Sequence, residues 1–143
     1  MKRRKLGQHY LADREVVRKI IEAARIRPHE KVLEIGTGRG TLTKELARLG
    51  SGFEGFEVDR ENYDQTVMLL GDANARIHLG DAFLQRPDFD VLVASLPYSE
   101  SATFVEWLSG LGYNRAVVLL QEDFVRKVLA PPGSRVAAGS LPM

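Results

Sequence analysis

The feature that most constrains this chain is a glycine-rich turn that directly follows a short apolar run. The run is Lys31–Ile35, KVLEI, which predicts a buried strand, and the turn is Gly36–Gly40, GTGRG. A helical pattern follows from about Thr41 to Leu49 and ends at Gly50–Gly52. Glycines allow a tight turn and a close approach of the backbone to a ligand, and the following helix offers free N–H groups. This order predicts a parallel α/β fold with a ligand site at the loop.

Apolar runs alternate with helical patterns along the rest of the chain, which is typical of a parallel α/β sheet. The runs that predict strands are 31–35, 53–58, 75–79, 89–94 and 115–120. The patterns that predict helices are 13–24, with Asp13 as N-cap, then 41–49, 61–70, 101–108 and 122–129. Because crossovers between parallel strands are right-handed, these strands predict a doubly wound sheet of order 3-2-1-4-5. Its ligand crevice should lie at the carboxyl ends of the strands, beside strand one.

Polar elements follow four of these strands. They are the glycine loop with Gly36 and Gly38, then Glu57, then Asp81, and finally Ser95–Tyr98, SLPY. Because the carboxyl ends of parallel strands meet at one edge, we expect these elements to converge. Glu57 can accept hydrogen bonds from the two hydroxyls of a ribose, and Asp81 can accept one from an adenine amino group. Together they predict a cofactor that contains adenosine.

A dinucleotide is the obvious rival to such a cofactor. Its fingerprint is G-x-G-x-x-G. Here the third glycine, Gly40, comes one position too early and is followed by Thr41, and Glu34 stands where a dehydrogenase strand is normally apolar. Asp81 could also simply cap a turn, and Tyr98 could be a core aromatic. The four polar elements in this order are therefore stronger evidence for an adenosine-containing cofactor than any one of them alone.

Composition bounds the class of protein. The 143 residues suit one domain, 1–143, and 44% of them are hydrophobic, which is enough for a core. The absence of cysteine excludes disulfides, cysteine-ligated zinc and a cysteine nucleophile. No segment approaches the roughly 20 apolar residues of a membrane span, and no secretory signal is evident. We therefore expect a cytoplasmic protein with no membrane partner.

The charge is uneven although the net charge is only +1. Lys2–Lys5, KRRK, is a basic head within an N-terminal arm that we place at residues 1–12. Such a run is either a solvated terminus or an arm that contacts phosphates.

Several segments resemble those of the ribosomal RNA adenine dimethyltransferases, which include the small-subunit enzymes and the erythromycin-resistance methylases. The most family-specific segment is Gly7–Leu11, GQHYL, and Leu33–Thr43 resembles the cofactor loop of the family. The other matching segments are 57–59, 80–82, 95–98, 120–122 and 132–134. The resemblance covers nearly the whole chain. It implies a Rossmann-like class I fold that uses S-adenosylmethionine.

The resemblance also implies how the cofactor is held. His9 and Leu11 would border its methionine end with Gly36, beside Gly38 of the same loop. Glu57 would bind the ribose. Outside the family pattern, His9 would be read as a surface histidine. Asp81 would bind the adenine ring, and Ser95 would face both the cofactor and the target base.

The same resemblance implies a catalytic role for Ser95, Leu96, Pro97 and Tyr98. Adenine N6 is a poor nucleophile, and the family frees its lone pair with an Asn side-chain carbonyl and the backbone carbonyl of Leu. The aromatic residue stacks on the base. No metal is needed. Position 95 is Ser instead of Asn, and a hydroxyl is a shorter acceptor that also donates.

Three functions remain open at this point. The first is methylation of adenine N6 in ribosomal RNA, in the small subunit and twice per base. The second is a non-catalytic module that binds S-adenosylmethionine or RNA in ribosome assembly. The third is a methyltransferase that acts on another amino group.

The end of the chain gives a further expectation. This fold usually carries two more strands, and the RNA enzymes add a small helical domain; both are expected to be missing here. Strand five, 115–120, should then lie at the sheet edge, where unpaired N–H and C=O groups invite another strand. We expect self-association through this edge or a stability much lower than that of a longer version. The alternative is that the tail, 135–143, folds back and shields the edge as a loop.

Overall fold

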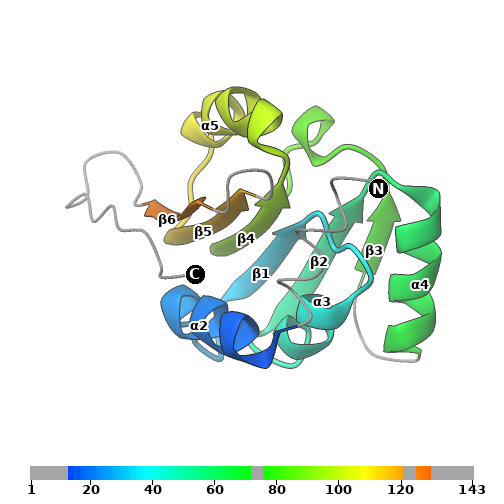
Figure 1. Cartoon of the computed structure of the whole chain (residues 1–143). Helices are drawn as coiled ribbons and strands as arrows, with labels where there is room; N and C mark the ends of the chain where they lie inside the picture. The colour runs from blue at the N-terminus through cyan, green and yellow to red at the C-terminus, as the bar shows by residue number, and fades with distance from the viewer. Residues whose placement is uncertain (1–12, 72–75, 121–124, 130–143) are drawn as a thin grey trace.

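The computed structural model describes residues 13–71, 76–120 and 125–129, which form one six-stranded sheet flanked by helices (Figure 1). The strand order is β3-β2-β1-β4-β5-β6. The strands are β1 Lys31–Ile35, β2 Gly52–Glu57, β3 Arg76–Leu79, β4 Val91–Leu96, β5 Arg115–Leu120 and β6 Val125–Leu129. His9 and Leu11 lie outside the described residues.

Strands β1 to β5 are parallel, and this confirms the predicted order 3-2-1-4-5. Strand β1 lies at the centre, where Leu33 pairs with Glu54 of β2 and with Leu92 of β4. The direction in which strands are added reverses between β1 and β4. This is the switch point at which doubly wound sheets bind ligands.

Two layers of helices cover the sheet (Figure 1). Helices α2 Arg14–Ala24 and α3 Thr41–Leu46 pack on one face, with Ile20, Leu46 and Val93 in their shared core. Helix α5 Ser101–Ser109 packs on the other face, where Phe104 and Leu108 meet the apolar side chains of β4 and β5. The remaining elements are α4 Arg60–Leu70, which contacts β2 and β3, and the 3-10 turns η1 Ala82–Leu84 and η2 Tyr98–Glu100.

The segment 122–129 was predicted to be a helix, and this is wrong for residues 125–129, whereas residues 122–124 lie outside the described residues. Residues 125–129 form β6, which runs antiparallel to β5 with Leu120 opposite Val125 and Ala116 opposite Leu129. The spacing of Val125, Val128 and Leu129 fits one face of a helix as well as a strand, so local pattern alone could not decide. The strand is favoured because its pairing with β5 satisfies backbone N–H and C=O groups that β5 would otherwise leave unpaired.

The same pairing overturns the expectation that β5 is the sheet edge. Strand β5 has β4 on one side and β6 on the other, so it is not the edge of the sheet. The physical basis for self-association through β5 is therefore gone. None of the described helices is both long and apolar enough to cross a bilayer.

Candidate active site

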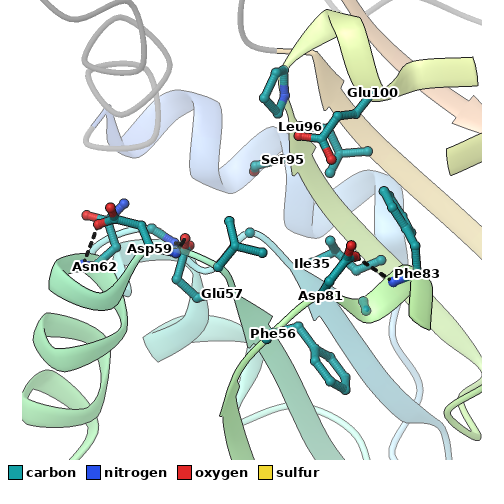
Figure 2. A pocket seen from close by; sticks show the side chains of 16 residues that line it. Ile35, Phe56, Glu57, Asp59, Asn62, Asp81, Phe83, Ser95, Leu96 and Glu100 are labelled. Carbon is teal, nitrogen blue, oxygen red and sulfur yellow. Dashed lines mark hydrogen bonds between the residues drawn. The ribbon is translucent and has the colours of Figure 1, made fainter. Parts of the chain in front are cut away.

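A cavity of about 350 Å³ lies at the carboxyl ends of β1 to β4 (Figure 2). Cavities of roughly 300–1,000 Å³ are typical of small-molecule sites. The lining includes Gly36, Gly38, Glu57, Asp81 and the segment 95–97. The structure thus brings together all four polar elements that follow the strands, except that Tyr98 of the fourth element does not line the cavity.

The glycine loop lies tightly against the end of β4. Gly36 has a φ of 81°, and a Cβ at this position would lie 2.3 Å from the carbonyl oxygen of Ser95. Gly38 has a φ of 58° and faces open space on the cavity side. Both positions favour glycine because of the positive φ, and Gly36 also because no side chain fits. A ligand can therefore approach the loop backbone closely.

Helix α4 holds this loop through Thr66, a residue that the sequence analysis missed. The buried Thr66 hydroxyl donates to the carbonyl of Gly38 at 2.7 Å and lies 3.1 Å from the hydroxyl of Thr37. Gly40 faces the same helix, since a Cβ there would lie 3.1 Å from the Cα of Thr66. The only sequence signal was a threonine within a polar helix, which marks no particular role.

Glu57 fixes the loop from the end of β2. The residue is only 6% exposed. One carboxylate oxygen accepts from the N–H of Gly38 at 2.7 Å and the other from the N–H of Asp59 at 2.9 Å. Burial raises the pKa of Glu57, although these backbone hydrogen bonds oppose the rise. Each oxygen keeps further acceptor capacity, which is what two ribose hydroxyls would need.

Asp81 has a capping role in addition to its place in the cavity. Its carboxylate accepts from the N–H of Phe83 at 2.9 Å and so caps η1. The alternative in which Asp81 caps a turn is therefore confirmed. The residue is exposed and also lines the cavity, so the cap does not remove it from the site.

Ser95 and Tyr98 occupy contrasting environments at the end of β4. Ser95 is 3% exposed, and its hydroxyl has no hydrogen-bond partner among the described residues. It lines the cavity and also borders a small space near Ile20 and Val117. Tyr98 is 51% exposed and begins η2, so the alternative of a core aromatic is wrong. Its ring is accessible to a ligand.

A second buried carboxyl, Glu34, connects the strand before the loop to the helix after it. Glu34 is fully buried and accepts a hydrogen bond from the hydroxyl of Thr43 in α3. Its other oxygen has no partner among the described residues. Burial raises the pKa of Glu34 to about 8, and the negative charge of Glu57 adds to the rise. In the sequence, Glu34 was informative only as a residue that disfavours a dinucleotide site.

The charge of the cavity is negative. Its lining contains Glu57, Asp59, Asp81 and Glu100, and no Lys, Arg or His among the described residues. Such a cavity repels the phosphates of a dinucleotide and suits an adenosine ligand without phosphate. Within the described ranges, no three His, Asp or Glu side chains lie close enough together to hold a metal ion.

The strand order, the glycine loop after β1 and the carboxylate that ends β2 define a class I S-adenosylmethionine-dependent methyltransferase fold. More narrowly, the chain belongs to the ribosomal RNA adenine dimethylase family, whose sequence pattern matches residues 1–140.

Individual relatives agree with this assignment. The chain is 33% identical over 134 residues to a probable ribosomal RNA small subunit methyltransferase A of Pyrococcus furiosus, covering 93% of this chain and 49% of the relative. The crystal structure of a dimethyladenosine transferase from Plasmodium falciparum superposes with a TM-score of 0.69 at 31% identity, over 78% of this chain and 43% of that one. The 23S rRNA methyltransferase ErmE gives 0.71 at 28% identity, over 78% and 48%. The chain thus spans about half the length of the curated relatives that it matches.

Proposed function

We propose that this domain transfers methyl groups from S-adenosylmethionine to the N6 atom of adenine in ribosomal RNA. The small subunit and dimethylation are the proposed target and outcome. The observation that carries the proposal is that one cavity joins the glycine loop held by Glu57 to the segment that begins at Ser95. Membership of the family supports the same reaction.

The residues of the cavity fit the proposed cofactor. Glu57 would accept from the ribose hydroxyls, and Asp81 from the adenine amino group. The backbone of Gly36 and Gly38 would lie beside the methionine part. His9 and Leu11 are proposed for the same end but lie outside the described residues. When bound, S-adenosylmethionine supplies an electrophilic methyl group.

The segment after β4 would hold the target base. The exposed ring of Tyr98 can stack on an adenine, a contact worth ~1–3 kcal/mol. The backbone carbonyl of Leu96 and the hydroxyl of Ser95 would accept from the amino protons, and Pro97 would fix the direction of the chain between them. These acceptors leave the nitrogen lone pair free to attack. The rate gain would come mainly from positioning.

The proposed partner is ribosomal RNA, free or in an assembling small subunit. The basic head at Lys2–Lys5 would contact its phosphates. A substrate of this kind is consistent with the expected cytoplasmic location, which stays a prediction.

One observation favours a second candidate, a non-catalytic module that binds the cofactor or RNA. The acceptor at position 95 is a short hydroxyl with almost no exposed surface, where the family has an asparagine amide. A site of this kind could retain both ligands without activating the base.

Methyl transfer from labelled cofactor to naked small-subunit RNA separates these candidates, with protein and small-molecule acceptors as controls. Label in N6-methylated adenine that disappears in Glu57→Ala, but not in the exposed control Glu61→Ala, would support the proposal. Cofactor binding without transfer would favour the second candidate. Transfer only to a protein or a small molecule would refute RNA as the substrate.

A further inference from the structure

Glu100 is a cavity residue that the proposed function has not used. It is the last residue of η2, and it lines the cavity formed at the carboxyl ends of the strands. Figure 2 shows Glu100 and Asp81 on opposite walls, with both carboxylates directed into the space between them. Asp81 belongs to the segment after β3, and Glu100 to the segment after β4. Fold topology alone brings these two carboxylates together.

The space between the two carboxylates is apolar. Ile35, Leu96 and Phe83 line it (Figure 2). The region thus offers apolar walls with an acceptor on each side. A flat aromatic ring that carries hydrogen-bond donors on one edge matches this arrangement.

Within the part of the chain that the structure describes, neither carboxylate faces a cationic side chain across the cavity. Among the described residues that line the cavity there is no Lys, Arg or His, and none of the described residues gives the Glu100 carboxylate a hydrogen bond or an ion pair. Partial burial and the nearby charge of Asp81 raise the pKa of Glu100. Two facing acceptors that repel one another are best satisfied by a ligand that gives one donor to each.

We propose that Glu100 and Asp81 together bind the exocyclic amino group of the cofactor adenine, and that each carboxylate accepts one of its two hydrogens. This inference rests on the proposed function and assigns the purine specificity of the same cavity. An amino group has two N–H bonds that point in different directions, so one carboxylate cannot satisfy both. A purine with a carbonyl oxygen at this position would place an acceptor against two acceptors and be rejected.

The test compares two ligands that differ at this position and at the adjacent ring nitrogen N1, which carries a hydrogen only in the oxo form. S-adenosylhomocysteine carries the amino group, and S-inosylhomocysteine carries a carbonyl oxygen in its place. Calorimetry should show that the unmodified chain prefers the adenosyl ligand. Glu100→Ala should weaken binding of that ligand by roughly tenfold, while binding of the inosyl ligand stays constant or improves. Glu100→Gln keeps an acceptor oxygen and should retain most of the adenosyl affinity.

Glu106→Ala is the matched control, because Glu106 is an exposed carboxylate on α5 that does not line the cavity. It should change neither affinity. An equal loss for both ligands in Glu100→Ala, or no loss for either, would overturn the assignment of Glu100 and leave the proposed function intact. If the unmodified chain binds neither ligand, the proposed function itself fails and the assignment fails with it.

Discussion

Replacing Glu34 by glutamine should remove much of the pH dependence of the free energy of unfolding between pH 5 and pH 8. Glu34 is fully buried at the end of β1, and burial raises its pKa to about 8 from an ordinary value of 4.5. Between these two values the folded chain keeps the proton and the unfolded chain releases it. Stability therefore falls as the pH rises through this interval.

The size of the effect follows from the pKa difference. One pKa unit corresponds to ~1.4 kcal/mol, so the slope approaches that value per pH unit. From pH 5 to pH 8 the folded state should lose roughly 3 kcal/mol through Glu34 alone, a large part of the net stability of a small domain. Glutamine has almost the same shape and can still accept from Thr43, but it does not titrate in this range.

Urea unfolding at pH 5, 6, 7 and 8, without cofactor, measures the difference. The free energy of unfolding of the unmodified chain should fall relative to that of Glu34→Gln at each step. Glu61→Gln, an exposed change on α4, should follow the unmodified chain. Parallel curves for the unmodified chain and Glu34→Gln would show that Glu34 titrates normally, and the reasoning from burial would then be refuted.

Three further predictions concern the site. Glu57→Ala should weaken cofactor binding at least tenfold, or ~1.4 kcal/mol, because it removes the acceptors for the ribose; unchanged affinity in a folded variant, measured by calorimetry, would contradict this role. Ser95→Asn should leave methylation of RNA at least as fast as before, since the amide restores a longer acceptor; a variant that binds cofactor normally yet loses label transfer would show that Ser95 acts differently. Gly36→Ala should lower the free energy of unfolding by more than about 2 kcal/mol, because the new Cβ meets the carbonyl of Ser95 at 2.3 Å. Gly38→Ala faces open space and should cost less in the same urea titration.

Local patterns predicted most of the fold. The apolar run of β1 and the loop after it are short-range features, and the order of the parallel strands follows from the handedness of their crossovers. The helix prediction for residues 125–129 was wrong because the conformation of this segment depends on its pairing with β5. The edge of β5 that these residues pair with exists only in the assembled sheet, so it cannot be detected from the sequence of residues 125–129 alone.

The site was predictable in outline but not in its supporting contacts. Glu57 and Asp81 could be assigned to the cavity because each lies at the carboxyl end of a predicted strand. The hold of Thr66 on the loop and the opposition of Glu100 and Asp81 join segments that are distant along the chain. The burial of the Ser95 hydroxyl depends on which face of β4 the side chain takes and on what packs there. The amino-acid sequence around Ser95 contains neither of these facts, so the burial of its hydroxyl was not predictable.

The close approach of Gly36 to Ser95 has a consequence for the two ligands of the proposed reaction. A Cβ on Gly36 would lie only 2.3 Å from the carbonyl oxygen of Ser95. The backbone of the glycine loop, which would bind the cofactor, therefore lies directly against the segment that would bind the base, with no side chain between them. The N–H of Gly36 is also held by the carbonyl of Phe56 at 2.8 Å. A displacement of either segment is therefore transmitted to its neighbour. If the occupied positions of the two segments differ from the empty ones, cofactor and base bind cooperatively, and each changes the affinity for the other by the same factor.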